Sequence, residues 1–306
     1  MSNRGRRGFA LIELVTGIGV VLVLVALQLP GIQQARESAR LQQCVNNMRQ
    51  MGLALHNYHS VNDTFPMSAV AGPGHGNGHS GFMQIMPYME QVAVYNAYNF
   101  WLENWHVANN TATSVKIATY ICPSNPATDP TPATEIRTHD DKPYPGRSEF
   151  GPGHYGMNWG GVRAASGAEV AKAYPRANYN GPTHLGVLLT VVESDGKGGK
   201  TKNIGMRDIL DGSSFTLAVA EKLDSFGWAV GGWGGSEFDV NTSLLYEGDD
   251  AKLKRVFTGS LHSGGLNVTF ADGSVKFLKS TLDQKTWYSL TTRNQGEIIP
   301  VAKFNQ

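Results

Sequence analysis

The stretch that decides the fold is residues 9–29, FALIELVTGIGVVLVLVALQL, in which Glu13 is the only charged residue. A helix of this length is about 32 Å long, which is enough to cross the hydrocarbon core of a bilayer. Arg4, Arg6 and Arg7 precede it, and basic residues beside an apolar segment stay on the cytoplasmic side. The sequence therefore predicts one transmembrane helix over 9–29, with the leader 1–8 in the cytoplasm and the C-terminal body outside it.

The junction between the leader and the apolar segment is Gly8-Phe9, and Glu13 is the fifth residue counted from Phe9. A secretory signal peptide would instead carry small residues after the apolar run, where this chain has QLPGIQQAR. Residues 7–27, RGFALIELVTGIGVVLVLVAL, resemble the cleavage and N-methylation region of type IV pilins and type II secretion pseudopilins. The resemblance implies that prepilin peptidase cuts between Gly8 and Phe9 and methylates the new amine.

Glu13 carries a carboxylate inside the predicted membrane helix. Such a charge costs about 2.5–3.5 kcal/mol on insertion scales, so it needs a partner or a purpose. The pilin resemblance implies an assembly role, in which the carboxylate of one subunit meets the N-terminal amine of its neighbour as the helices stack. The alternative is that Glu13 lies near the helix end and reaches the membrane interface.

The helical pattern continues after Pro30, where the missing N–H and the ring predict a kink or a local break. In residues 30–60 apolar side chains recur at spacings of three and four, and this predicts a stripe packed on the body. The stripe consists of Ile32, Ala35, Ala39, Val45, Met48, Met51 and Leu55, while Arg36, Glu37, Arg40 and Arg49 are expected to face water or neighbouring subunits. A helix from Ile12 to His59 would be roughly 70 Å long.

Residues 61–306 are expected to form a β-rich extracytoplasmic domain. The predicted fold class is therefore α+β and pilin-like, a long N-terminal helix packed on an antiparallel β-rich domain. Short helices are expected within 82–100, around Pro87, and strands at 114–124, 154–160, 184–194, 214–222 and 254–260. The strongest hairpin signal is Asp272-Gly273, because both residues accept positive φ. A terminal helix is expected from an SxxD start at Ser280 to about Thr292.

His262 and Asp272 are separated by nine residues, and Gly273 follows directly. Together with QQCVNNMRQMGLALHNYH at 42–59, ICPS at 121–124 and TTRNQGEII at 291–299, this signature resembles one large prepilin-type family that is found especially in planctomycete bacteria. The C-terminal region of that family is known mainly as a domain of unknown function. The resemblance therefore implies a class and an export route without a mechanism.

Two cysteines, Cys44 and Cys122, lack the spacing of a zinc site, and no metal site is predicted. If the body lies outside the cytoplasm they can form a disulfide, and closing that loop contributes about 4 kcal/mol. Two buried free thiols are the alternative.

His262 and Asp272 allow a catalytic or metal-binding interpretation across the hairpin. The structural one is favoured, in which His262 bonds to the turn at Gly264-Gly265 and Asp272 forms the hairpin turn. His75 and His79 lie in a polar loop without a carboxylate or cysteine beside them. Calcium stays open as a ligand of acidic loops, although the spacing of the acidic candidates fits no calcium loop; they are Asp208, Asp211, Asp249 and Asp250.

The sequence thus favours a filament subunit, a pilin or pseudopilin, over an enzyme, since the chain contains none of the common catalytic motifs. The expected partners are prepilin peptidase, other pilin-like subunits and copies of itself, an inner-membrane assembly platform and the lipid bilayer. A net charge of +1 argues against nucleic acid as a partner. One alternative is an anchored extracytoplasmic binding protein, for a ligand such as polysaccharide, that uses the leader for export and binds through tryptophans: Trp101, Trp105, Trp159, Trp228 and Trp233. The other is an anchored enzyme that uses His262 and Asp272.

Overall fold

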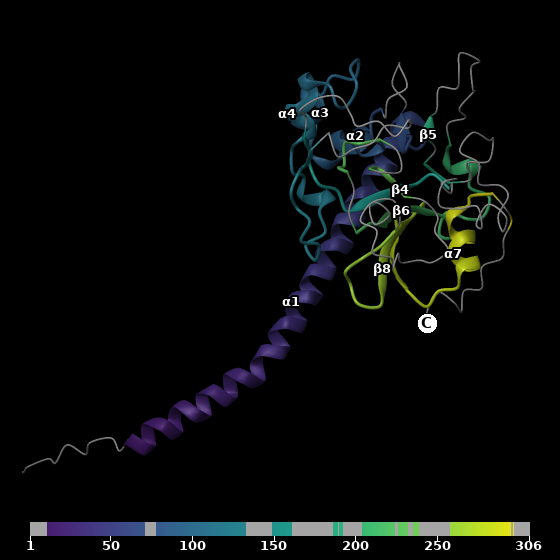
Figure 1. The fold of residues 1–306 in the computed structure, drawn as a ribbon. Helices are drawn as coiled ribbons and strands as arrows, with labels where there is room; N and C mark the ends of the chain where they lie inside the picture. Colours follow the sequence, from purple (N-terminus) through teal and green to yellow (C-terminus); the bar gives the residue numbers. More distant parts are fainter. Residues whose placement is uncertain are drawn as a thin grey trace, which may run out of the picture.

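Helix α1, Leu11–Asn62, forms the axis of the molecule in the computed structural model (Figure 1). The structure describes residues 11–70, 78–132, 149–160, 186–188, 190–191, 204–223, 226–231, 235–238, 258–294 and 296. At 1.5 Å per residue the 52 residues of α1 span about 78 Å, slightly more than the sequence predicted. The helix continues through Pro30, so the local break that was one of two expectations there does not occur, and Figure 1 shows α1 gently curved. Gly8 and Phe9 lie outside the described residues.

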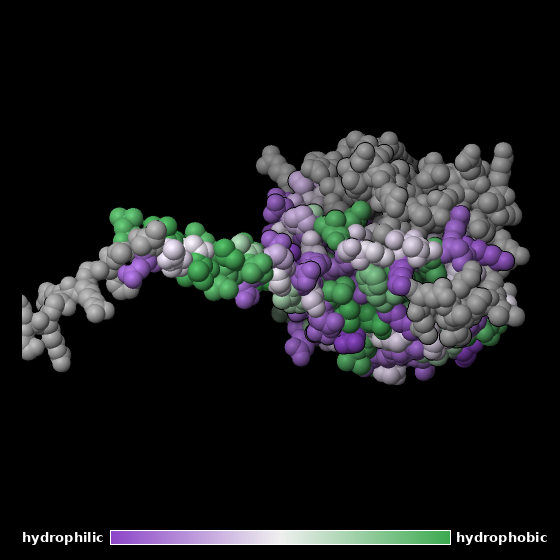
Figure 2. Space-filling model, turned by 90° about the horizontal axis from the view of Figure 1, so that it is seen from below, coloured by the Kyte–Doolittle hydropathy of each residue, from purple (hydrophilic) through white to green (hydrophobic). Residues whose placement is uncertain are grey.

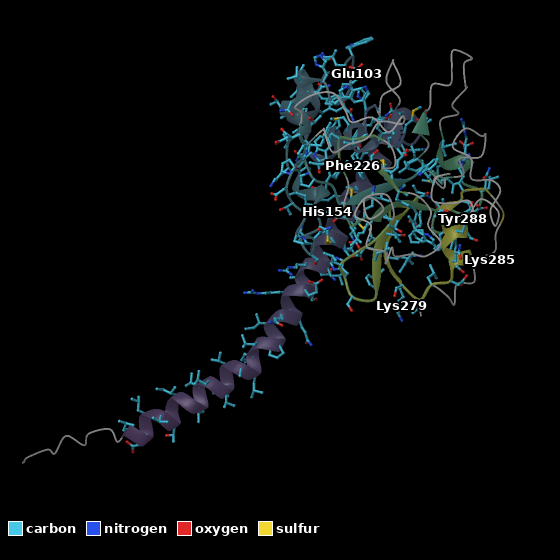
Figure 3. The ribbon with its side chains drawn as sticks, viewed as in Figure 1. Glu103, His154, Phe226, Lys279, Lys285 and Tyr288 are labelled. Carbon is cyan, nitrogen blue, oxygen red and sulfur yellow. A yellow bond between two sulfur atoms is a disulfide. The ribbon has the colours of Figure 1, made fainter. Side chains whose placement is uncertain are left out.

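The first half of α1 stands clear of the body. Figures 2 and 3 show it projecting alone, and on the face seen in Figure 2 its side chains are mostly hydrophobic. None of its most apolar stretch is buried, and α1 is long and apolar enough to cross a membrane, although a signal sequence near the N-terminus would pass the same test. The first half of α1 therefore exposes a hydrophobic surface that is unfavourable in water.

The second half of α1 packs on the body, and burial begins at Cys44. Met48, Met51 and Leu55 are buried, as the predicted stripe requires, and they join the larger of two hydrophobic cores. The prediction is wrong for the beginning of the stripe, because Ile32, Ala35 and Ala39 are exposed. These positions precede the point where the body meets the helix.

A five-stranded sheet lies against α1, with the strand order β7-β4-β6-β8-β9. Neighbouring strands are antiparallel except β4 and β7, which pair in parallel. The strands of the sheet are β4 Tyr155–Asn158, β6 Leu217–Glu221, β7 Glu237–Phe238, β8 Gly265–Phe270 and β9 Val275–Lys279. The mixed α+β architecture with an antiparallel-rich sheet is confirmed.

The two faces of β8 contact different elements. Thr269 donates a hydrogen bond to the carbonyl of Met48 on α1, while Leu266, Val268 and Phe270 enter the second hydrophobic core. That core is completed by Trp287 of α7, Gln284–Thr291, so α1 and α7 cover opposite faces of the sheet. Alternation along β8 produces this division, because successive side chains point to opposite faces.

The start of α7 corrects the sequence prediction. Its N-cap is Asp283, whose carboxylate accepts a hydrogen bond from the Thr286 N–H at 2.9 Å, so the cap lies three residues after the one expected at Ser280. An N-cap side chain of this kind satisfies one of the free N–H groups of the first turn. The β8–β9 hairpin is confirmed, and Gly273 adopts φ +81° in its turn.

A layer of short helices covers the upper part of α1 (Figure 1). The predicted break at Pro87 appears as a change from α-helix to 3₁₀-helix. The layer consists of α2 Gly81–Ile85, η1 Met86–Met89, α3 Val92–Ala97, η2 Val107–Asn109 and α4 Asn110–Thr113. The remaining short elements are β1 Ala69–Val70, β2 Thr131–Pro132, β3 Glu149–Phe150, β5 Thr190–Val191 and η5 Met206–Asp208.

The segment 114–124 is not the strand that its alternation predicted. It contains a 3₁₀ turn, η3 Ala118–Tyr120, with Ile117 and Tyr120 buried. The Asn47 side chain on α1 donates to the carbonyl of Ile121 at 3.0 Å, so α1 satisfies a backbone group that a neighbouring strand would otherwise use. The predicted strand at 184–194 is described only in part, by β5, and in 254–260 the described residue Thr258 forms an isolated bridge to Lys222.

Candidate functional site

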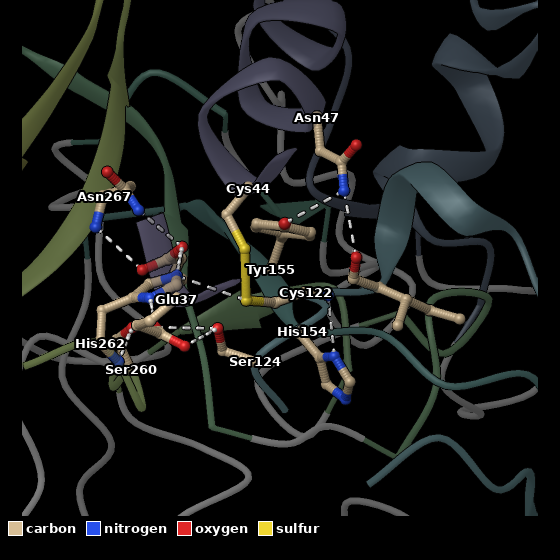
Figure 4. A network of polar contacts seen from close by, with 12 residues as sticks. Glu37, Cys44, Asn47, Cys122, Ser124, His154, Tyr155, Ser260, His262 and Asn267 are labelled. Atoms are coloured by element: carbon tan, nitrogen blue, oxygen red, sulfur yellow. Dashed lines mark hydrogen bonds and ion pairs between the residues drawn. A yellow bond between two sulfur atoms is a disulfide. The ribbon is translucent and has the colours of Figure 1, made fainter. Parts of the chain in front are cut away.

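A cluster of polar and sulfur-containing side chains lies where α1 enters the body (Figure 4). Glu37 and Cys44 come from α1, and Cys122 follows η3. Glu221 is the last residue of β6, and His262 precedes β8 by three residues. Four segments that are far apart in the sequence thus supply one small volume at the base of the body.

The Cys44–Cys122 disulfide joins α1 to the segment after η3, with the two Cα atoms 5.4 Å apart. Both cysteines are buried. The backbone N–H of Cys122 donates to Nδ1 of His154 at 3.1 Å. Because Nδ1 accepts there, Nε2 of His154 carries the proton and donates to the carbonyl of Ala127 at 2.8 Å. The segment that carries Cys122 is therefore fixed to α1 by the disulfide and to His154 by two hydrogen bonds.

His262 is the centre of the cluster, with a side chain that is only 3% exposed. Its Nδ1 lies 2.9 Å from a carboxylate oxygen of Glu37. Its Nε2 lies 3.6 Å from Sγ of Cys122 and 3.6 Å from Oε1 of Glu221. The Nδ1 atom of His262 thus faces one carboxylate, and its Nε2 atom faces the sulfur of Cys122 and the second carboxylate.

Glu221 is held by β8 across the sheet. Its two carboxylate oxygens accept one hydrogen bond each from the backbone N–H and the side-chain amide of Asn267, both at 2.9 Å. Burial raises the pKa of Glu221, and the hydrogen bonds from Asn267 and the proximity of His262 oppose that rise. The backbone bond from Gly259 N–H to the Glu221 carbonyl brings the segment before His262 to the end of β6.

Glu37 lies at the rim of the cluster, and 43% of its side chain is exposed. Its partial burial acts to raise its pKa, but hydrogen bonds from His262 and Ser124, with Arg40 nearby, lower it overall. Ser124 donates to both carboxylate oxygens, at 3.1 and 3.3 Å. Glu37 is thus an ionised group that orients His262 from the water-facing side.

The structure does not bring His262 and Asp272 together. His262 precedes β8 and Asp272 follows it, at the other end of the strand, where its carboxylate accepts from the Ser274 N–H at 2.8 Å. The expected bond from His262 to the Gly264-Gly265 turn is replaced by the contacts with Glu37, Cys122 and Glu221. His262 and Asp272 therefore cannot act together on one substrate across the hairpin, which is the arrangement that the enzyme alternative requires.

The other candidates have structural surroundings or lie outside the described residues. His79 contacts the Tyr98 hydroxyl at 2.9 Å and the Phe100 carbonyl at 3.0 Å. Asp208 and Asp211 accept hydrogen bonds from backbone N–H groups, those of Gly205 and Gly296. Trp159 and Trp228 are buried in the core, whereas Trp101 is 92% exposed. Outside the described residues lie His75, Trp233, Asp249 and Asp250.

Sequence reasoning missed Glu37, Glu221 and Asn267, and it expected Glu37 to face water or other subunits. One signal was present, because Glu37 and Cys44 are seven residues apart and therefore lie on one face of a helix, two turns apart. The contacts with Glu221 and His262 depend on the fold. Among the residues that the structure describes, Cys44, Cys122, Glu221 and His262 form a group whose ligand atoms all lie within 4.8 Å of one another.

Comparison with known proteins yields one match, to a family model that covers residues 33–244 and 226–285. The matched region begins after the apolar half of α1 and includes all members of the cluster. No curated protein and no solved structure matches the chain. The predicted membership of a family of unknown function is confirmed at this level, while the match does not test the leader. The chain belongs to the family described as "Protein of unknown function (DUF1559)", whose model carries the short name SBP_bac_10.

Proposed function

We propose that the chain is a structural subunit of a type IV pilus-like or type II secretion-like filament, cut by prepilin peptidase and held in the inner membrane until it assembles. The observation that carries this proposal is the division of α1. Its N-terminal part is apolar and projects from the body, and its C-terminal part, from Cys44 onward, is packed into the body. A helix of this design presents one end to other apolar surfaces and fixes a domain to the other end.

The apolar side chains of the projecting half are stable only when they are buried away from water. Large apolar side chains exposed on it include Leu11, Leu14, Val15, Ile18, Val20, Val21, Leu22, Val23, Leu24, Val25, Leu27, Leu29 and Ile32. Full burial of such a side chain contributes about 1.5–3 kcal/mol, so even the lower figure gives of the order of 20 kcal/mol for the set. A bilayer and a bundle of neighbouring helices both supply this cover. Transfer from lipid into a filament core therefore exchanges one apolar environment for another.

Glu13 gives the bundle a means of setting its register. It lies in the exposed half of α1, within its first turn. A carboxylate in an apolar environment is stabilised by a nearby amine, and the amine of Phe9 would be created by cleavage. We infer that Glu13 of one subunit meets that amine of the next, which fixes the axial offset between identical helices.

The N-terminal mass of the mature protein from native membranes tests this proposal. A chain that begins at N-methylated Phe9 is expected. Gly8→Val should leave the chain uncut, whereas Gly5→Val, a matched change elsewhere in the leader, should not affect cleavage. An intact Met1 end, or a cut after Leu29, would overturn the proposal.

A second candidate is an anchored extracytoplasmic binding protein, which the short name SBP_bac_10 hints at. The exposed Trp101 is the side chain that favours it, because aromatic surfaces suit the apolar faces of sugars. Dispersed single subunits in the membrane with saturable glycan binding that Trp101→Ala abolishes would favour this candidate. Cross-linking of Cys-substituted α1 helices into ladders would favour the filament.

A further inference from the structure

We propose that the cluster is a redox-gated metal site: when the disulfide is reduced, it binds one divalent zinc ion through Cys44, Cys122, His262 and Glu221. Two thiolates, an imidazole nitrogen and a carboxylate oxygen are a donor set that zinc accepts in tetrahedral sites. All four residues are buried, and their ligand atoms lie within 4.8 Å of one another. The inference is independent of the filament proposal.

The distances around His262 match a tetrahedral ion. From bond lengths of about 2.05 Å to nitrogen, 2.3 Å to sulfur and 2.1 Å to oxygen, a tetrahedral angle gives about 3.6 Å between N and S and about 3.4 Å between N and O. Nε2 of His262 lies 3.6 Å from Sγ of Cys122 and 3.6 Å from Oε1 of Glu221. The separation of Nε2 and Oε1 is longer than a hydrogen bond between nitrogen and oxygen, while that of Nε2 and Sγ is also within hydrogen-bonding distance for sulfur, and both suit groups that share one ion.

The residues that hydrogen-bond to the proposed ligands are also of the kind found around metal sites. Ligating histidines commonly give their second N–H to a carboxylate, which fixes the ring and its tautomer. Here Nδ1 of His262 faces Glu37 at 2.9 Å, so Nε2 is turned inward. Asn267 holds Glu221 with two hydrogen bonds of 2.9 Å, which fixes the carboxylate as well. The ion would cancel two of the three negative charges that two thiolates and Glu221 bring together.

Oxidation and metal binding exclude each other. A disulfide holds its sulfurs about 2.05 Å apart, whereas two thiolates on one tetrahedral zinc ion are about 3.8 Å apart. Reduction by a dithiol supplies two electrons and two protons, breaks the S–S bond and leaves the reductant as a disulfide. Zinc then displaces the two thiol protons, so binding releases protons. The cluster is thereby either a covalent staple or a metal site, according to the thiol–disulfide balance around it.

Cobalt titration of the full chain in detergent tests the proposal, because Co²⁺ replaces Zn²⁺ and absorbs visible light when bound by thiolates. The protein is reduced with a phosphine and separated from it without air, and a second sample stays oxidised. The reduced protein is expected to bind one Co²⁺ with tetrahedral thiolate absorption that one equivalent of Zn²⁺ abolishes. The oxidised protein should show none of this absorption.

Two variants separate a built site from a chance pair of thiols. His262→Ala removes a ligand and should lower affinity at least 100-fold, while Glu37→Gln leaves every ligand in place and should lower it about 10–100-fold through the orientation of His262. Asp272→Asn, at the far end of β8, is the matched control and should bind as the wild type does. If reduction unfolds the body, Zn²⁺ should restore its circular dichroism.

Three results would overturn the proposal. The first is a reduced protein with two titratable thiols that binds no cobalt, or whose lost structure zinc does not restore. The second is equal binding by the oxidised protein. The third is binding that neither His262→Ala nor Glu37→Gln weakens, since this would show two thiols acting without the rest of the cluster.

Discussion

Removal of the Cys44–Cys122 disulfide is expected to destabilise the body by several kilocalories per mole. The two cysteines are 78 residues apart in sequence, and chain-entropy treatment of a loop of that size gives about 4.5 kcal/mol at 25 °C. The double variant Cys44→Ala, Cys122→Ala leaves neither thiol to bind a metal. It also removes the sulfur that lies 3.6 Å from Nε2 of His262, so some loss of packing adds to the entropic effect.

Urea unfolding of the full chain in detergent measures this loss. The fluorescence of the buried tryptophans, Trp159, Trp228 and Trp287, reports on both hydrophobic cores, and the apolar half of α1 stays in the micelle throughout. With an m-value of about 2–3 kcal/mol per molar urea, a loss of about 4.5 kcal/mol lowers the midpoint by about 1.5–2.3 M. Wild-type protein that is reduced and kept in a chelator keeps both sulfurs, so its midpoint should lie well below that of the oxidised protein and slightly above that of the double variant.

Two outcomes would contradict the reasoning. One is a double variant whose midpoint lies within about 0.3 M of the oxidised wild type, which corresponds to less than about 1 kcal/mol. The other is a wild type whose midpoint does not change on reduction, because the loop of residues 44–122 would then be constrained equally well without the bond.

Two further predictions concern the β8–β9 turn. Gly273→Ala should lower the free energy of unfolding by more than about 1–2 kcal/mol, because a side chain is strained at φ +81° and its Cβ would lie 3.2 Å from His56. Gly264→Ala, just before β8, has φ +86° and no atom within 4 Å of the added Cβ, so it carries the backbone strain alone. Its free energy of unfolding should therefore fall by less. Equal urea midpoints for the two variants would contradict this. At Asp272, partial burial acts to raise the pKa, but hydrogen bonds from Ser274 and Ser214 and the charge of Lys276 lower it below its ordinary value of 3.8. A lowered pKa contributes stability above that ordinary value and loses it as pH falls through the folded-state pKa, so Asp272→Asn should be less stable than the wild type near pH 7, and this difference should shrink as pH falls below 3.8. A difference in urea midpoint that stays constant over this range would show that the charge contributes nothing.

The features that sequence analysis predicted correctly depend on residues close together in the chain. The 21-residue apolar run and the spacing of Met48, Met51 and Leu55 are sufficient for the long helix and its buried face. Asp272-Gly273 indicates its hairpin locally, although only Gly273 has the positive φ expected of both residues, and Asp272 instead accepts a hydrogen bond from the Ser274 N–H. The terminal helix was found for the same reason, although Asp283 and not Ser280 caps it.

The cluster was not predicted, because its contacts join distant segments. Glu37 and His262 are 225 residues apart, and nothing near either residue indicates the other. The segment 114–124 shows the same difficulty in secondary structure. Its apolar spacing predicts a strand, but an amide from α1, that of Asn47, takes up its backbone carbonyls, and it forms a 3₁₀ turn instead.

The position of the cluster on α1 gives it a mechanical consequence for a filament subunit. Cys44 is the first residue of α1 to be buried, so the disulfide lies at the boundary between the projecting half and the packed half. Any pull on the apolar end reaches the body first through Glu37, which contacts His262 two turns before the point of burial, and through Cys44. Apolar packing resists such a pull only where the helix still contacts the body. A covalent bond at Cys44 prevents the helix from separating from the body at the first packed turn. If the filament proposal holds, oxidised subunits should therefore withstand extraction from the membrane with the body intact, and reduced, metal-free subunits should lose the structure around Met48 and Met51 first.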